Sequence, residues 1–213
     1  MYCTFVREFT SDPEKNLLAI PRKQRAMVRK GQQNGLQTRQ DDDARDLYQM
    51  YSESLRNLGT PVFARRYLRI LLQVFGSDAE VLTVMREGAP VSSVLSFRFR
   101  NQILPYYGGG TSAARGVAAN DFMYWQVMEH AREQGLSVFD FGRSKRDTGS
   151  FDFKKNWGFE PQPLHYEYFM VAARELPDLS PKNPKYDRLI RLWRRLPVGL
   201  TRIVGPWVAG ALG

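Results

Sequence analysis

Apolar residues along the chain are spaced first as in helices, then as in strands, and then as in helices again. In residues 40–59 they recur every three or four positions after an acidic start, which predicts a helix that ends at Gly59. The same spacing predicts a second helix over residues 63–75. Residues 120–135 form a third predicted helix, and the apolar character of its start on nearly all sides is typical of a buried helix.

A period of two replaces the helical spacing between the second and third of these helices. Residues 80–87, 91–100 and 102–110 are predicted to form three antiparallel strands joined by tight turns. Two more short strands are predicted at 136–142 and 164–172, with an irregular segment between them. A strand meander followed by a helical crossover to another strand is typical of an α/β domain with a mixed sheet.

Both ends of the chain are basic. Residues 13–31 are predicted to form a short strand or turn and then a basic helix, which begins near Pro21 and stops at Gly31. Near the other end, residues 186–196 have the pattern of a basic amphipathic helix.

The charge divides the chain into three parts. Its 213 residues carry a formal net charge of +9, and 43% of them are apolar, enough for one buried core. Residues 1–40 and residues 174–213 each hold 8 Lys or Arg and 3 Asp or Glu, whereas residues 41–173 hold 15 and 16. We therefore expect a near-neutral globular domain at 41–173, between a basic N-terminal segment at 1–40 and a basic, Pro-rich tail at 174–213.

Few side chains suit metal binding or nucleophilic catalysis. Cys3 is the single cysteine, which excludes an internal disulfide and a cysteine-based metal cage. His130 and His165 have no acid or nucleophile at a telling spacing, so both are expected to be structural and no metal site is predicted. The apolar stretch 196–213 contains Pro206 and four glycines, which argues against a transmembrane helix.

A glycine-rich loop, residues 108–121, joins a predicted strand to the start of a predicted helix. Backbone N–H groups and the positive end of a helix dipole attract anions, so Gly109, Gly110 and Arg115 are candidate ligands for a donor phosphate. The loop matches neither the dinucleotide-binding nor the P-loop pattern, and a plain connecting loop is the alternative interpretation.

Residues 139–159 carry the most informative pattern. A buried strand ends at Gly142 and is followed at once by Arg143 and Lys145, and Lys154 lies among aromatic residues. Cations held against apolar walls suit the binding of an anion or of a developing oxyanion. Asp140 is expected to be the partner of an arginine or of the backbone rather than a general base. A basic surface loop whose aromatic residues serve the core is the alternative.

The same segment resembles a known family. FDFGRSK…TGSFDFKKNWGFEP…LHYEY, at 139–168, is similar to the end of the second acyltransferase-like domain of Fem-type aminoacyl transferases. It is especially similar to the FemAB-like proteins of the PEP-CTERM/exosortase exopolysaccharide system of Gram-negative bacteria, and the resemblance covers roughly residues 20–210. It implies a GNAT-like α/β acyltransferase fold with a mixed, splayed sheet flanked by helices. It also implies that residues 1–40 are a remnant of a first GNAT-like domain.

The resemblance further implies an activity: transfer of an aminoacyl group from aminoacyl-tRNA to the amine of a cell-envelope or exopolysaccharide precursor, with no tightly bound cofactor. Lys154 would stabilise the tetrahedral oxyanion, and Phe153 would shape the site. We expect Arg143 and Lys145 to bind an anionic group of the substrate, and Tyr107 and Trp157 to line the pocket, with Asp140 beside it.

Two other functions remain open. The same fold can use an acyl-CoA donor, whose pyrophosphate would lie at the loop 108–121. Alternatively, the chain is a degenerate, non-catalytic module whose basic ends bind an anionic membrane or RNA. Because the opening sequence lacks the apolar stretch of a signal peptide, we expect a cytoplasmic protein, peripheral at the inner face of the inner membrane through its basic tail.

Overall fold

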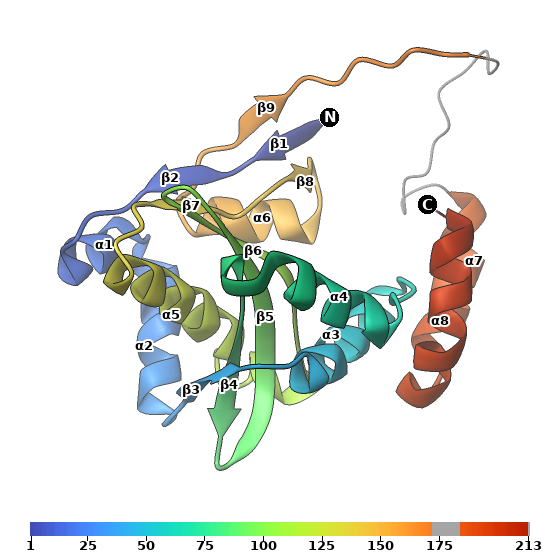
Figure 1. Cartoon of the computed structure of the whole chain (residues 1–213), viewed down its shortest axis with the longest axis horizontal. Coiled ribbons are helices and arrows are strands. Elements are labelled where there is room, and N and C mark those ends of the chain that lie inside the picture. Colours follow the sequence, from blue (N-terminus) through green and yellow to red (C-terminus); the bar gives the residue numbers. More distant parts are fainter. Residues whose placement is uncertain (172–183, 213) are drawn as a thin grey trace.

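The computed structural model describes residues 1–171 and 184–212, which form an α/β domain with a helical hairpin at one side (Figure 1). The strands are β1 (Tyr2–Thr4), β2 (Val6–Glu8), β3 (Gln37–Asp41), β4 (Ala79–Arg86), β5 (Ala89–Phe99), β6 (Gln102–Gly110), β7 (Val138–Asp140), β8 (Ser144–Lys145) and β9 (Gln162–Leu164). The helices are α1 (Pro13–Ala19), α2 (Arg22–Gln33), α3 (Arg45–Leu58), α4 (Arg65–Phe75), α5 (Ala119–Glu133), α6 (Gly149–Asn156), α7 (Pro184–Arg195) and α8 (Val198–Leu212).

A six-stranded mixed sheet in the order β2-β7-β6-β5-β4-β3 organises the fold. The predicted meander is confirmed, because β4, β5 and β6 pair antiparallel in sequence order. The predicted crossover is confirmed as well, since β6 and β7 pair parallel and α5 connects them. A second, three-stranded sheet has the order β8-β1-β9.

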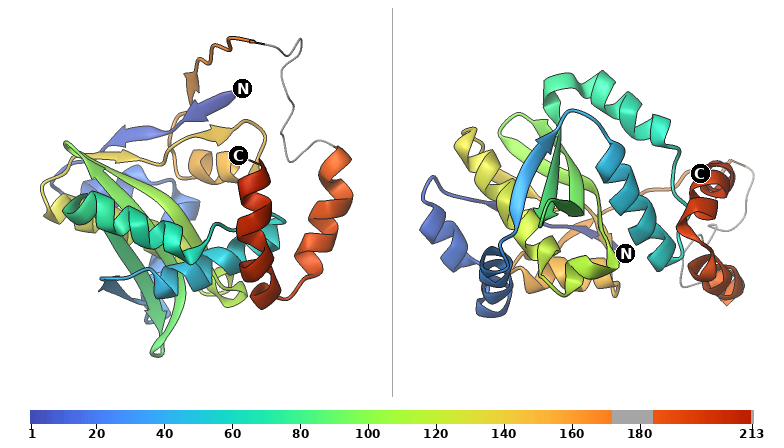
Figure 2. Two further views of the ribbon diagram at one scale, coloured as in Figure 1. Left: turned by 45° about the vertical axis from the view of Figure 1, so that its right-hand side comes forward. Right: turned by 90° about the horizontal axis from the view of Figure 1, so that it is seen from below.

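Helices cover both faces of the six-stranded sheet (Figures 1 and 2). On one face, α3 and α4 enclose a cluster that includes Leu47, Leu68 and Leu95. On the other face, α2 and α5 enclose the larger cluster, which contains Phe139 of β7, Phe122 and further buried side chains of α5. The two apolar faces of the sheet are thereby buried, as a layered α/β domain requires.

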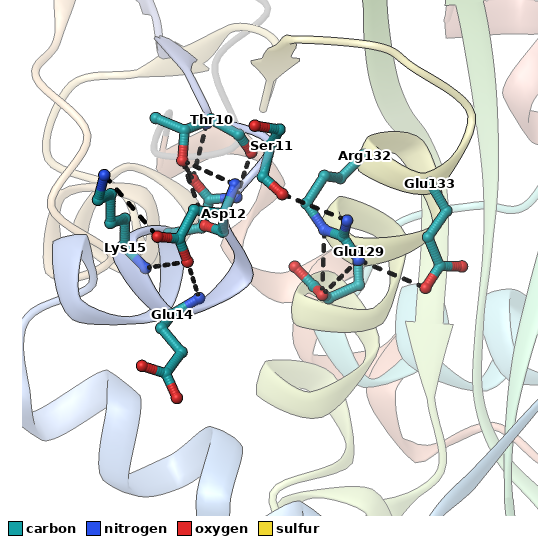
Figure 3. A network of polar contacts seen from close by, with 9 residues as sticks. Thr10, Ser11, Asp12, Glu14, Lys15, Glu129, Arg132 and Glu133 are labelled. Carbon is teal, nitrogen blue, oxygen red and sulfur yellow. Dashed lines mark hydrogen bonds and ion pairs between the residues drawn. The ribbon is translucent and has the colours of Figure 1, made fainter.

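The N-terminal segment is part of the same sheet. β2 pairs with β7, and β3 pairs with β4 at the opposite edge, so a boundary drawn at residue 40 falls inside β3. Figure 3 shows a further link, in which Arg132 of α5 donates a hydrogen bond to the carbonyl oxygen of Ser11 and pairs with Glu129 and Glu133. Residues 1–40 are therefore part of the domain and supply β2 and most of β3, the two edge strands of its main sheet.

Two expectations for residues 13–31 are wrong. Residues 13–19 form the helix α1, because Asp12 caps its start by accepting hydrogen bonds from the N–H groups of Glu14 and Lys15 (Figure 3). Helix α2 continues through Gly31 to Gln33. At Gly31 a Cβ would lie 2.6 Å from the Cβ of Phe122, so this glycine allows α2 and α5 to approach closely and does not end the helix.

Three differences concern the second half of the chain. The segment predicted to be irregular contains the short helix α6, whose start is capped by Thr148. The strand predicted at 164–172 is shorter and earlier, because only Gln162–Leu164 pairs with β1 and residues 165–171 form no strand. Residues 198–212 form the helix α8, with Pro206 inside it. None of the helices described in 1–171 and 184–212 has the length and apolar character that a membrane crossing needs.

Candidate functional site

A cavity of about 300 Å³ lies where β6 and β7 separate. The two strands pair at only two positions, Gln102 with Val138 and Ile103 with Phe139, and then diverge. The register between β5 and β6 also shifts at this level, which leaves Tyr106 as an extra residue on β6. The cavity is lined by Leu104, Pro105, Tyr106, Gly108, Tyr124, Phe141, Gly142, Arg143, Ser150, Phe153 and Lys154.

Lys154 places a buried cation in the wall of this cavity. It is 8% exposed, and its Nζ donates hydrogen bonds to the carbonyl oxygens of Gly142 (2.9 Å) and Arg143 (3.1 Å). Burial lowers the pKa of the Lys154 ammonium from 10.5 to about 8, and the charge of Asp140 opposes this shift. No carboxylate within the described residues forms an ion pair with Lys154. An ammonium has three N–H donors, and the third has no hydrogen-bond acceptor among the described residues. The Nζ lies 5.7 Å from the centre of the Phe5 ring.

Arg143 lies at the exposed rim of the same cavity. Its Nη1 donates a hydrogen bond to the hydroxyl of Tyr166 (3.1 Å), and its guanidinium lies 5.0 Å from the centre of the Tyr2 ring. The hydrogen bond to Tyr166 raises the pKa of Arg143, so the side chain stays charged. Two aromatic side chains thus hold a cation that remains accessible to an anion.

Asp140 and Lys145 lie beside the cavity but do not line it. The carboxylate of Asp140 accepts hydrogen bonds from the N–H of Gly142 (2.7 Å) and from the hydroxyl of Thr4 (3.2 Å). It is therefore a backbone partner, as expected from the sequence, and it stabilises the turn that follows β7. Lys145 pairs with Tyr2 in the small sheet and is half-buried there.

The structure places Trp157 and Tyr107 away from the cavity. Trp157 is fully buried, and its indole N–H donates a 3.0 Å hydrogen bond to Asp121, so it belongs to the core beneath the site. Tyr107 lies on the other face of the sheet, where its hydroxyl contacts that of Tyr67 at 2.8 Å and its ring packs against Tyr51. The expectation that these two side chains line the pocket is corrected accordingly. Phe153 does line it.

Two tyrosines that line the cavity were missed by the sequence analysis. Tyr106 is the extra residue at the bulge; it lines the cavity, and its ring packs against Phe97 and Tyr107. The proline before it was a usable signal because prolines within sheets concentrate at edges and bulges. Tyr124 of α5 packs against Phe141 and Phe153, and burial raises the pKa of its hydroxyl to about 12. No side chain in the described part of the chain forms a hydrogen bond with that hydroxyl. The sequence did not single out Tyr124, because it lies among apolar residues at the start of a predicted buried helix.

Gly109 and Gly110 of the glycine-rich loop pack closely against neighbouring segments of the protein. At Gly109 a Cβ would lie 2.6 Å from the carbonyl oxygen of Met50, so this glycine allows β6 to contact α3. At Gly110 a Cβ would lie 2.9 Å from that of Ala114. Both glycines are paired with β5 in the sheet. Their absence of a side chain is therefore explained by packing.

The N–H groups of the same loop are largely occupied. The N–H of Ser112 donates a 2.9 Å hydrogen bond to the carboxylate of Glu53, a side chain of α3. The N–H groups of Ala114, Gly116 and Ala118 donate to carbonyl oxygens of the loop itself. Arg115 is exposed, and within the described residues its side chain has no hydrogen bond or ion pair. An internal carboxylate therefore lies where a donor phosphate was expected.

A family model agrees with this arrangement of splayed strands. The acetyltransferase (GNAT) domain matches residues 22–155, which is more than half of the chain. The chain belongs to this GNAT family. The matched region contains the whole meander, the helix α5 and the cavity residues up to Lys154. The fold expected from the sequence, a GNAT-like domain with a mixed sheet flanked by helices, is confirmed, and the protein is a transferase.

Known proteins similar to this GNAT domain include Fem-type enzymes. Over 79 residues the chain is 30% identical to the lipid II:glycine glycyltransferase of Staphylococcus epidermidis, a stretch that is 34% of this chain and 19% of that protein. The fold is similar to that of FemX, with a TM-score of 0.68 and 16% identity over 75% of this chain and 59% of FemX. It is also similar to L-PGS from Bacillus licheniformis, with a TM-score of 0.56 and 15% identity over 76% of this chain and 59% of that one. The matches thus span less than two thirds of each of these proteins.

Proposed function

We propose that this GNAT domain is a Fem-type transferase that forms an amide on an amine-bearing precursor of the cell envelope or of an exopolysaccharide. The observation that carries the proposal is the buried ammonium of Lys154 in the wall of the cavity between β6 and β7, where it forms no direct ion pair among the described residues. The similarity to a lipid II:glycine glycyltransferase supports an acceptor from the envelope. A link to the PEP-CTERM system stays a prediction.

In the proposed reaction, the amine nitrogen of the acceptor attacks the carbonyl carbon of an aminoacyl ester. A C–N bond forms, the ester C–O bond breaks, and the amine loses a proton while the departing alcohol oxygen gains one. The carbonyl oxygen carries negative charge in the tetrahedral intermediate, and the free N–H of Lys154 would stabilise it. Because the carbonyl groups of Gly142 and Arg143 already hold this ammonium in place, little reorganisation is needed when the charge develops.

Other residues of the site would position the substrates. Arg143, at the rim, would bind a carboxylate or phosphate of a substrate, and Lys145 would add positive charge nearby. Phe153 and Phe141 would exclude water from the reacting carbonyl. The hydroxyl of Tyr124 would donate a hydrogen bond within the cavity, since its raised pKa keeps it protonated.

Aminoacyl-tRNA is the donor that we propose, with acyl-CoA as the alternative. The occupied N–H groups of the loop after β6, and the Glu53 carboxylate beside them, disfavour the binding of a CoA pyrophosphate there. No tightly bound cofactor is needed for either donor. A cytoplasmic location at the inner face of the inner membrane would give access to such substrates, and it is part of the proposal.

The experiment that tests the proposal is the substitution Lys154→Met, assayed with aminoacyl-tRNA and an amine acceptor. We expect transfer to fall by about 10²–10³ because the oxyanion loses its cation. The matched control is Lys155→Met, which removes the exposed neighbouring lysine and should retain transfer. Full activity of the Lys154→Met enzyme, or unfolding of that variant with Lys154→Arg equally unfolded, would contradict the assignment.

A calorimetric titration separates the donors. We expect aminoacyl-tRNA to bind and acetyl-CoA to show no saturable heat. Micromolar binding of acetyl-CoA that is lost in the Arg115→Ala variant would replace the proposed donor with acyl-CoA. Failure to transfer from either donor would favour the non-catalytic alternative.

A further inference from the structure

The hairpin formed by α7 and α8 lies beside α3 at one side of the domain (Figure 2). On α7, Ile190 packs against Gly59, and Arg194 donates a hydrogen bond to the carbonyl oxygen of Leu58. On α8, the backbone of Gly205 packs against Val62. The contacts with α3 and with the segment after it therefore define which sides of the two helices face the protein.

The single charged residue of α8 also faces the protein. Arg202 donates a 2.8 Å hydrogen bond to the hydroxyl of Ser52, and its guanidinium lies 5.9 Å from the centre of the Tyr48 ring. Thr201 beside it is buried. Arg202 thus attaches α8 to α3, the Thr201 hydroxyl donates to the carbonyl oxygen of Val198 in its own helix, and the outer side of α8 carries no charge among the residues described.

The outer side of α8 is a continuous apolar stripe. Leu200, Ile203, Val204 and Trp207 follow the spacing at which residues share one helix face, and all four are exposed. Ile203 is 70% exposed and Trp207 is 82% exposed. Large apolar side chains gathered on one exposed face of a helix indicate a binding surface, whereas single ones do not.

The outer side of α7 adds positive charge beside a second apolar strip. Leu189 and Leu192 are exposed on it. Arg188, Arg191 and Arg195, which share the adjacent part of the helix surface, are exposed as well. Asp187 is the single acidic residue in the two helices. The surface therefore combines aliphatic and indole groups with three arginines, and Asp187 next to Arg188 is the one acidic side chain beside them.

We propose that the outer face of the α7–α8 hairpin, defined by the exposed residues named above, binds the surface of an anionic lipid bilayer. An amphipathic helix lies in the interface with its apolar side chains at the boundary of the acyl chains, and its arginines contact anionic headgroups. Indole rings are enriched at that depth because they have one polar and one apolar part. Residues 184–212 of the expected basic tail thus form a surface of two helices, and α8 supplies its apolar stripe.

A membrane fits this surface better than RNA does. RNA would use the arginines and could stack on one aromatic ring, but it has no group that takes up Leu189, Leu192 and Ile203. A bilayer uses both kinds of side chain at once. This inference is independent of acyl transfer, so its failure would leave the proposed reaction untouched.

The test is co-sedimentation of the full chain with vesicles of phosphatidylcholine alone or mixed equally with phosphatidylglycerol. We expect binding to the mixed vesicles and at least about tenfold weaker binding to the neutral ones. Ile203→Ser combined with Trp207→Ser should weaken binding by about tenfold or more, and so should Arg188→Glu combined with Arg191→Glu. Binding should also shift the fluorescence emission of the wild type to shorter wavelength, and the shift should be lost in Trp207→Phe.

Matched controls lie outside the hairpin. Val74 on α4 is 73% exposed and Phe99 at the end of β5 is 61% exposed, so Val74→Ser with Phe99→Ser removes a similar apolar area. Arg66→Glu with Arg69→Glu, on α4, removes the same charge. The proposal is overturned if the controls weaken binding as much as the hairpin variants do, or if the wild type ignores both vesicles. It is also overturned if the arginine variants lose binding to a single-stranded RNA while no vesicle is bound.

Discussion

The Nζ of Lys154 donates a 2.9 Å hydrogen bond to the carbonyl oxygen of Gly142, so a side chain of α6 is held by the turn that directly follows β7. The contact joins α6 to the turn after β7, and both line the cavity that opens where β6 and β7 diverge. The position of the ammonium is therefore set by main-chain atoms, and its charge is left for a ligand.

The pH dependence of transfer should report the titration of Lys154. Burial lowers its pKa from 10.5 to about 8, and the oxyanion role needs the protonated form. Relative to an enzyme whose cation cannot titrate, we expect kcat/KM of the wild type to fall as pH rises through about 8. In a Lys154→Arg enzyme that retains measurable transfer, this fall should be absent, because a guanidinium stays charged over the whole range.

Loss of stability caused by the titration of Lys154 cannot explain this fall in kcat/KM. Between about 8 and 10.5 the unfolded chain holds the Lys154 proton and the native state does not, so this lysine makes the free energy of unfolding increase with pH in that window. Urea unfolding measured across the same range checks the sign. The acceptor amine must also be neutral to attack, so a rise with pH that the Lys154→Arg enzyme shares belongs to the acceptor. A rise through pH 8 that the Lys154→Arg enzyme lacks would instead indicate that neutral Lys154 acts as a base.

Substitution of Tyr124 should lower the rate without lowering stability. Tyr124→Phe removes a protonated hydroxyl from the cavity but keeps the ring contacts with Phe141 and Phe153. We expect kcat to fall by about tenfold, the loss typical of one hydrogen bond, with an unchanged melting temperature. Steady-state kinetics of Tyr124→Phe and of the control Tyr67→Phe, on the other face of the sheet, distinguish a role in the cavity from a general effect.

Gly109 should prove to be a packing residue. A Cβ there would lie 2.6 Å from a backbone oxygen of α3, so Gly109→Ala should reduce the free energy of unfolding by about 1–3 kcal/mol. Gly116→Ala, in the same loop, meets its nearest atom at 3.6 Å and should leave stability unchanged within about 0.5 kcal/mol. Urea unfolding measures both. If Gly109→Ala keeps full stability and loses donor binding instead, the loop contacts the donor.

The central elements of the fold follow from local patterns. The alternation in residues 102–110 and the spacing in 120–135 predicted β6 and α5 almost to the residue, because both are long and have many apolar positions. Strand β3, by contrast, reads QTRQD and is mostly exposed, so its pairing at the sheet edge has no apolar signature. Strands β1 and β2 have three residues each, too few to show a period.

The candidate site was predicted in part. Lys154, Phe153 and Arg143 meet in the cavity as the motif indicated, and the adjacent residues Tyr106 and Tyr107 show where sequence reasoning stops. Tyr106, the extra residue at a one-residue bulge, lines the cavity and Tyr107 does not, although their rings contact each other. Alternation cannot locate a bulge from apolar residues alone. Trp157 looked like part of the aromatic wall, but its indole N–H has a buried acceptor in Asp121, a residue 36 positions away.

By itself, the sequence determined the fold class, the order of the main elements and the segment that carries Lys154, since these depend on local periodicity and on residue type. Tertiary structure alone decided which side chains enter the cavity, which glycines serve close packing and which faces of α7 and α8 remain uncovered. Those outcomes depend on contacts between residues far apart in the chain, such as Gly109 with Met50 and Gly59 with Ile190. The basic ends illustrate both: their charge was evident from composition, and their arrangement in space follows from which side of each helix the domain covers.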